Sequence, residues 1–269
     1  MKYLNFTKME GAGNDFIVVD NRRRVLRNAA RLARRLTDRR HSIGADGLVL
    51  LEKSKKADLG MRILNPDGSQ APMCGNGIRC LAKFAFDRKF CGPTASIETL
   101  AGILGAGVRG DRVKVRMPNP RGLRLNLRLP LKGKTQTVHF IDTGVPHAVK
   151  WVEGSLEKVG VEGLGRAIRR HPRFAPRGAN VDFVALRKGG RVAIRTYERG
   201  VEGETFACGT GATAGALVAA ILKNLKSPVT VLTRGGENLK IYFSKNDGRF
   251  QKVSLEGRVK TCFEGRVSL

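Results

Sequence analysis

The sequence predicts a mixed α and β (α/β, α+β) fold of two structurally similar lobes related by an approximate two-fold axis. Three observations support this prediction. Short strand-like and helical segments alternate along the 269 residues. The pattern C-G-x-G opens an apolar, alanine-containing helical run twice, at Cys74 and at Cys208. An asparagine followed by a strand-like segment precedes each of these runs, at Asn14 and at Asn180.

Hydrophobic patterning predicts the elements of the first half in order. Strands are expected over residues 15–20, 47–52 and 61–65, where apolar and β-branched residues cluster. An arginine-studded helix is expected over residues 28–39, with its charges on a solvated face. The helical run after Cys74 covers residues 78–86.

A stretch rich in Pro, Gly and Asn, residues 117–122, interrupts the periodicity near the middle of the chain. It is the best candidate for a domain boundary, and the sequence therefore predicts lobes over residues 1–118 and 119–257. In the second half a strand is expected to begin at residues 180–184, and a helix over residues 212–222.

Composition limits the classes of protein that fit. The chain is 41% hydrophobic, which suffices for a full core, and no apolar run approaches the roughly 20 residues of a membrane span. No secretory signal pattern is recognised in residues 1–20, so a cytoplasmic location is expected. The five cysteines show no C-x-x-C spacing, which favours free thiols over disulfides or a metal site.

The two C-G-x-G segments indicate chemistry. A glycine-rich helix start leaves backbone N–H groups free to bind a carboxylate, and it stabilises a thiolate, so that a cysteine pKa can fall from about 8.5 towards neutrality. Two such starts facing one another in a cleft would provide one thiolate, one thiol and N–H donors. That set suits inversion at a carbon next to a carboxylate, without metal or pyridoxal.

The alternative for Cys74 and Cys208 is that they are inert helix starters or form a disulfide, and that the repeated pattern arose by chance. The matched pair in a matched context favours the chemical interpretation. The remaining cysteines, Cys80, Cys91 and Cys262, lack the glycine context and are interpreted as core or incidental residues.

Several motifs, taken together and in this order, resemble the diaminopimelate epimerase family. They are Lys8 to Phe16 (KMEGAGNDF), Ile43 to Gly47 (IGADG), Asn65 to Ser69 (NPDGS), Met73 to Cys80 (MCGNGIRC), Pro146 to Val149 (PHAV), Tyr197 to Gly200 (YERG) and Ala207 to Gly211 (ACGTG). The resemblance implies that each lobe is a curled sheet around a central helix. It also implies that a C-terminal strand, about residues 258–269, completes the first lobe.

The resemblance implies roles for individual residues. Cys74 and Cys208 match the paired acid/base cysteines of the family, which epimerises LL- and meso-diaminopimelate without a cofactor. The positions that match substrate-binding residues are Asn14, Asn65, Gly75, Asn76, His147, Asn180, Glu198, Arg199, Gly209 and Thr210. Without the motifs, Arg199 would be interpreted as a surface ion pair with Glu198 or Glu202, and His147 as a core histidine.

Four positions depart from the family pattern, where His, Gly, Gln and Asn are usual or frequent: Glu10, Ser42, Gly47 and Val145. They leave the cysteine chemistry intact but bear on how the distal end of the substrate is bound. A racemase of proline, hydroxyproline or histidine therefore stays open as an alternative. Asn76 argues against the proline type, which typically has His at that place.

A nucleic-acid-binding protein is the alternative from another class. Fifty basic residues against 23 acidic ones give a formal net charge of +27, and arginine clusters occur at residues 22–24 and 169–170. Aromatic residues are only 6% of the chain and do not interleave with the arginines, which indicates non-specific binding at most. The expected partner is a small-molecule substrate, with a homodimer left open.

Overall fold

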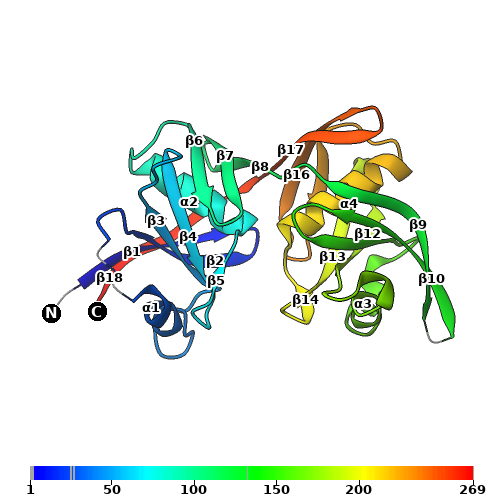
Figure 1. Cartoon of the computed structure of the whole chain (residues 1–269), viewed down its shortest axis with the longest axis horizontal. Coiled ribbons are helices and arrows are strands. Elements are labelled where there is room, and N and C mark those ends of the chain that lie inside the picture. Colours follow the sequence, from blue (N-terminus) through cyan, green and yellow to red (C-terminus); the bar gives the residue numbers. More distant parts are fainter. Residues whose placement is uncertain (1–2, 25, 27, 132, 269) are drawn as a thin grey trace. The chain divides into compact units, whose positions relative to one another are not determined.

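The computed structural model describes residues 3–24, 26, 28–131 and 133–268. It divides into two compact units, which we call the N-terminal unit (Met1–Arg116 with Gly257–Leu269) and the C-terminal unit (Met117–Glu256). The chain ends at residues 1 and 269, which the sequence analysis assigned to the first lobe, lie outside the described residues. Figure 1 shows both units as sheets wrapped on helices.

The N-terminal unit contains two helices and the first group of strands. Its elements are β1 (Tyr3–Gly11), β2 (Asn14–Asp20), α1 (Ala29–Leu36), β3 (Gly47–Glu52), β4 (Leu59–Leu64), β5 (Gln70–Ala71), α2 (Gly75–Asp87), β6 (Thr94–Thr99), β7 (Gly102–Arg109), β8 (Arg112–Arg116) and β18 (Lys260–Ser268). Strands pair in the order β18-β1-β2-β3-β4-β6-β7-β8, with β5 also on β4. Only the β2–β3 and β4–β6 pairs among these are parallel.

The C-terminal unit repeats this arrangement. Its elements are β9 (Arg121–Leu131), β10 (Lys134–Asp142), β11 (Pro146–Trp151), η1 (Leu156–Lys158), α3 (Val161–Arg169), η2 (Pro172–Phe174), β12 (Asn180–Leu186), η3 (Lys188–Gly190), β13 (Val192–Glu198), β14 (Gly203–Thr205), α4 (Gly209–Leu222), β15 (Val229–Leu232), β16 (Asn238–Asn246) and β17 (Arg249–Arg258). The strand order is β9-β10-β11-β12-β13-β15-β16-β17, with β14 on β13.

The two units therefore share one topology, strand by strand. The parallel pairs β11–β12 and β13–β15 correspond to β2–β3 and β4–β6, and α3 and α4 occupy the chain positions of α1 and α2. In the C-terminal unit the outer strand β9 directly precedes β10. In the N-terminal unit the same place is filled by β18, which returns from the far end of the chain to pair with β1 (Figure 1).

Each unit has a central helix enclosed by its sheet. Helix α2 contacts β1, β2, β3, β4, β7 and β8, and α4 contacts β10, β11, β12, β13, β15 and β16. Most of α4 is buried and apolar, because strands surround it. Helices α1 and α3 pack on the outer face, where α1 buries only Ala29, Leu32, Ala33 and Leu36. The predicted mixed α and β fold with a central helix is confirmed.

Two details of the predicted elements were wrong. The helix expected over residues 28–39 is shorter, because Asn28 caps its start by accepting the Arg31 N–H and Thr37 ends it. The repeated pattern of an asparagine followed by a strand, at Asn14 and at Asn180, falls on strands that are not equivalent. Asn14 opens β2, whose counterpart is β11, whereas Asn180 opens β12, whose counterpart is β3. Local patterns of similar strands look alike, and only the pairing fixes their places.

Candidate functional site

Both C-G-x-G segments begin a central helix in the same way, with the cysteine as the N-cap residue. Cys74 and Cys208 have extended backbones (φ −139° and −127°). The Cys74 sulfur accepts the Gly77 N–H at 3.5 Å, and the Cys208 sulfur accepts the Gly211 N–H at 3.4 Å. Each sulfur therefore lies at the positive end of a helix, where negative charge is stabilised.

The two glycines of the C-G-x-G pattern are explained by different surroundings. A Cβ added at Gly77 would lie 2.9 Å from Ile63 Cδ1, and one added at Gly211 would lie 2.4 Å from Asp182 Oδ1. The second glycine thus allows the helix to approach the sheet closely, and the fit is tighter at Gly211 than at Gly77. A Cβ at Gly75 would meet no heavy atom of the described residues within 4 Å. The first turn of α2 is therefore open to a ligand.

In the N-terminal unit, hydrogen bonds join three of the predicted residues. Asn76 Nδ2 donates to Asn14 Oδ1 at 2.6 Å, and Asn14 Nδ2 donates to Asp46 Oδ2 at 2.9 Å. The fully buried Arg79 donates to Asn76 Oδ1 at 2.9 Å and to the Gly75 carbonyl at 3.2 Å. Asn14, Gly75 and Asn76 are therefore held in one network at the start of α2.

In the C-terminal unit, a second network surrounds His147, which is fully buried. Its Nδ1 lies 2.6 Å from Asp182 Oδ2, and Thr196 Oγ1 donates to Asp182 Oδ1 at 2.7 Å. Its Nε2 lies 3.5 Å from Asn180 Nδ2, and Asn180 Oδ1 accepts the Arg199 N–H at 2.8 Å. His147, Asn180 and Arg199 are therefore brought together at the edge formed by β11, β12 and β13.

Cys208 lies in an electronegative and nearly closed environment. Its sulfur is 3.3 Å from Thr210 Oγ1, and its residue is only 8% exposed. Burial raises the pKa of the Cys208 thiol well above its usual value, and the negative charges of Glu198 and Asp182 raise it further. A helix start can lower the pKa of a cysteine, but at Cys208 burial and two carboxylates outweigh the helix N–H donors, so Cys208 matches the thiol of the expected thiolate and thiol pair.

Glu198 is the remaining charged group of this network. Burial raises the pKa of its carboxyl most, Thr205 and His147 oppose the rise, and Asp182 adds to it. The ion pair considered for Arg199 with Glu202 is replaced by another arrangement. Glu202 pairs with Arg169 at 2.7 Å and with Arg170 at 3.7 Å.

Other residues of interest stand apart from these networks. Asn65 is exposed, and its Nδ2 donates to Ser69 Oγ at 3.0 Å within the turn after β4. All five cysteines lie in the described part of the chain, and none of them forms a disulfide there. Cys80 lies in the core, where burial raises its pKa, while Cys91 is half-buried and Cys262 is exposed.

Four residues of the networks were not predicted as site residues from the sequence: Asp46, Arg79, Asp182 and Thr196. A signal for Asp182 exists, because an aspartate in the middle of the otherwise apolar strand NVDFVAL is rarely buried without a specific partner. Arg79 offered a similar signal, as an arginine in an apolar helical run. Thr196 gives no signal, since threonine is ordinary in a strand.

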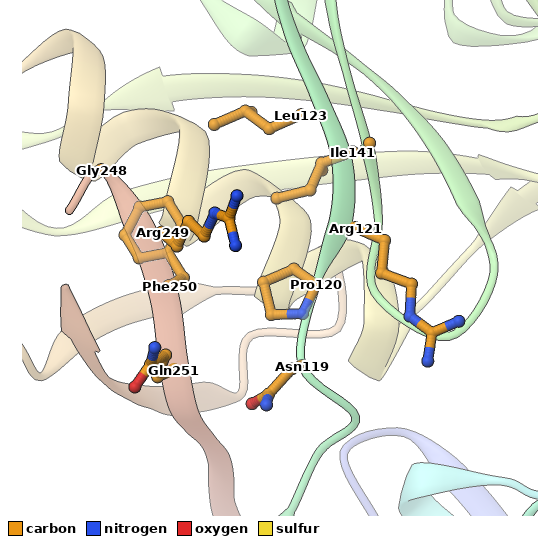
Figure 2. Close-up of a pocket in the computed structure, with 10 residues that line it drawn as sticks. Asn119, Pro120, Arg121, Leu123, Ile141, Gly248, Arg249, Phe250 and Gln251 are labelled. Carbon is orange, nitrogen blue, oxygen red and sulfur yellow. The ribbon is translucent and has the colours of Figure 1, made fainter. Parts of the chain in front are cut away.

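A pocket of about 650 Å³ lies elsewhere in the C-terminal unit (Figure 2). Its lining includes Arg121, Leu123, Ile141, Arg249 and Phe250, from β9, β10 and β17, and none of the predicted site residues. Within the described part of the chain, no group of three His, Cys, Asp or Glu residues could hold a metal ion. None of the helices described is long and apolar enough to cross a membrane.

Comparison with known proteins decides the family. The family described as diaminopimelate epimerase matches residues 6–122 and 139–261. The chain belongs to the diaminopimelate epimerase family. The diaminopimelate epimerase of Hydrogenobaculum sp. (strain Y04AAS1) is 43% identical over 275 residues, which cover 97% of this chain and 98% of that protein. The diaminopimelate epimerase of Aquifex aeolicus is 44% identical over 279 residues, 98% of each chain.

Solved structures with lower identity share the fold of this family member. A PhzF-family phenazine biosynthesis protein of Bacillus anthracis is similar over 100% of both chains, with a TM-score of 0.77 and 18% identity. A hydroxyproline epimerase of Agrobacterium vitis is similar over 99% of this chain and 93% of that chain, with a TM-score of 0.69 and 19% identity. The resemblance to diaminopimelate epimerases drawn from the motifs is confirmed.

Proposed function

We propose that the chain interconverts LL- and meso-diaminopimelate, with Cys74 and Cys208 as the two acid/base groups at one α-carbon. One observation carries the proposal. In a member of this family, both cysteines cap equivalent central helices, and each sulfur accepts the N–H of the third helical residue. This activity belongs to the biosynthesis of lysine and of peptidoglycan precursors.

The chemistry needs no cofactor. One sulfur, as the thiolate, removes the α-proton and becomes a thiol. The other sulfur, as the thiol, gives its proton to the opposite face of the same carbon and becomes a thiolate. The N–H groups of Gly75, Asn76, Gly209 and Thr210, at the two helix starts, are proposed to bind the neighbouring carboxylate and to stabilise the charge that develops on it.

The remaining substrate groups have partners of suitable chemistry. Arg199 supplies a cation for the distal carboxylate, and amide oxygens of Asn14, Asn65 and Asn180 suit an ammonium group. His147 and Glu198 are proposed to position the amino group at the reacting carbon. Val145 stands where many relatives have an asparagine, so the distal end is proposed to be bound with one amide contact fewer.

The proposal also concerns where the enzyme acts and what else it binds. We expect it to act in the cytoplasm on a free amino acid and allow for a homodimer. The high positive charge is proposed to give only salt-sensitive, non-specific binding of nucleic acid.

The test is deuterium incorporation from D2O into purified LL- and meso-diaminopimelate, followed by NMR. Cys74→Ser and Cys208→Ser should each lose at least about a thousandfold in kcat, because a serine hydroxyl is a far weaker base than a thiolate. Cys262→Ser changes an exposed cysteine in the same way and should retain normal turnover. Near-normal turnover in either of the first two variants would contradict the two-cysteine scheme.

The same experiment also examines the racemase alternative. Proline, hydroxyproline and histidine are offered separately in D2O under identical conditions. Exchange into one of them, with none into diaminopimelate, would replace the proposed substrate while leaving both cysteines in place.

A further inference from the structure

The repeated topology allows the side chains that pack beneath the start of each central helix, α2 and α4, to be compared residue by residue. We call these side chains the layer beneath the helix. Val49 and Ile63 are direct partners in the β3–β4 pair, and both would contact a Cβ added at Gly77. Asp182 and Thr196 are direct partners in the β12–β13 pair, and both would contact a Cβ added at Gly211. The two pairs therefore occupy the same place in their units.

A third member of the layer follows from the parallel strands. Phe16 pairs with Gly47, the first residue of β3, and His147 pairs with Asn180, the first residue of β12. Phe16 and His147 are thus equivalent, and both are buried. Beneath Cys74 the layer is Phe, Val and Ile, and beneath Cys208 it is His, Asp and Thr.

This difference is not required by the fold. The apolar layer of the N-terminal unit shows that hydrophobic side chains fill the same place well. A buried carboxylate and imidazole are unfavourable there unless they are fully paired, as they are at 2.6 and 2.7 Å. A polar cluster in only one of two equivalent places points to a task that the two cysteines do not share.

The cluster acts on Cys208 through charge and close packing. Asp182 Oδ1 lies beneath Gly211, whose N–H is the donor to the Cys208 sulfur. The titratable groups of the C-terminal unit that act on Cys208 are Glu198 and Asp182. His147 is in turn bonded to Asp182, and Thr210 is the nearest hydroxyl. Burial disfavours the thiolate most, and the two carboxylates, Glu198 and then Asp182, repel it further, so this environment favours the protonated sulfur.

We propose that Asp182, held by His147 and Thr196, is a positioning residue that makes the two halves unequal and keeps Cys208 as the thiol in the substrate-free enzyme. The inference rests on the proposed two-cysteine reaction. Cys74 is then the sulfur that ionises more readily and accepts the α-proton of one stereoisomer, with Cys208 as the donor. The opposite stereoisomer reacts with the form in which Cys208 is the thiolate and Cys74 is the thiol. After product release, Cys74 returns its proton to solvent and Cys208 regains one, so that the starting form is restored.

Asp182 also fixes the orientation of His147. Because the carboxylate accepts from Nδ1, the Nε2 side is directed towards Asn180, whose amide also accepts the Arg199 N–H. Loss of the carboxylate would therefore release the imidazole as well as the charge beneath α4.

The test measures each thiol separately and needs no diaminopimelate. The full chain is alkylated with iodoacetamide over a range of pH, and modification of Cys74 and Cys208 is quantified by peptide mass spectrometry. In the wild type, the pH midpoint of alkylation should be higher for Cys208 than for Cys74. In Asp182→Asn the Cys208 midpoint should fall by about one pH unit, with alkylation near pH 7 about tenfold faster and Cys74 unchanged.

Controls separate charge from loss of packing. Val184→Ala truncates a buried side chain on the same strand without changing charge and should leave both midpoints in place. Thr196→Val keeps the carboxylate and removes one of its donors, so the Cys208 midpoint should not fall. If circular dichroism shows that Asp182→Asn does not fold, the alkylation midpoints of the wild type and of Thr196→Val still test the inference.

Three results would overturn the inference: a wild-type Cys208 midpoint at or below that of Cys74, an unmoved Cys208 midpoint in Asp182→Asn, or an equal shift in Val184→Ala. Absence of deuterium exchange into diaminopimelate, with the midpoints as expected, would instead overturn the proposed substrate alone. The two failures are therefore distinguishable.

Discussion

Replacement of Gly211 by alanine tests how closely α4 is fitted to its sheet. The added methyl group would lie 2.4 Å from Asp182 Oδ1 and 3.2 Å from Thr196 Oγ1, so the carboxylate must move. Breaking a buried charged network costs about 3–5 kcal/mol. Alanine is favoured over glycine in a helix by about 1 kcal/mol, which leaves a net loss of about 2–4 kcal/mol in the free energy of unfolding.

The assay is thermal unfolding by scanning calorimetry, where such a loss lowers Tm by roughly 4–16 °C for a chain of this size. Two matched variants calibrate the result. Gly75→Ala meets nothing within 4 Å and should not destabilise the protein. Gly77→Ala comes too close only to the flexible end of Ile63, with ordinary contacts to Cys74 and Val49, and should have a small effect. A Gly211→Ala protein that melts within about 1 °C of the wild type would refute the steric argument.

Three further predictions follow from other contacts. Gly75→Ala, although stable, should raise KM for diaminopimelate, since its methyl group occupies the open first turn of α2; an unchanged KM would count against carboxylate binding there. Gly165→Ala should lower Tm, because its Cβ would lie 2.6 Å from the Tyr197 Cβ between α3 and β13, as thermal unfolding can show. Burial raises the pKa of Asp15, but Arg39 and Lys8 outweigh it and hold that pKa well below its usual value. A carboxyl whose pKa is lower in the folded state stabilises that state at pH values above its unfolded pKa of about 3.9, and this contribution is lost as pH falls. Urea unfolding should therefore show Asp15→Asn destabilised at pH 7, with the difference from the wild type shrinking as pH falls below about 4.

The sequence was informative where function depends on local geometry. A helix start that needs an N-cap with a free side-chain acceptor and a closely packed third residue is visible as C-G-x-G, so Cys74 and Cys208 could be located from the chain alone. The strand β3 was likewise predicted with its observed bounds, Gly47–Glu52, because it is a short run of buried aliphatic residues.

What the sequence could not provide is long-range pairing. Nothing local indicates that β2 corresponds to β11. The similar sequences at Asn14 and Asn180 suggest instead that β2 corresponds to β12, which the strand pairing contradicts. Hydrogen bonds such as His147 to Asp182 join residues 35 positions apart, and they exist only once β11 and β12 lie side by side. The raised pKa of Cys208 has the same origin, since it depends first on burial and then on two carboxylates that come from β13 and β12.

Duplication of one topology explains why two equivalent cysteines arise, and divergence beneath them explains how they can differ. In the proposed reaction, two chemically equal sulfurs would compete for one proton. An unequal layer removes that competition, because Phe16, Val49 and Ile63 carry no charge while Asp182 does. The buried polar cluster lowers the stability of the folded state. Replacing His147, Asp182 and Thr196 by apolar residues is therefore predicted to raise the free energy of unfolding and to remove the difference between the two cysteines.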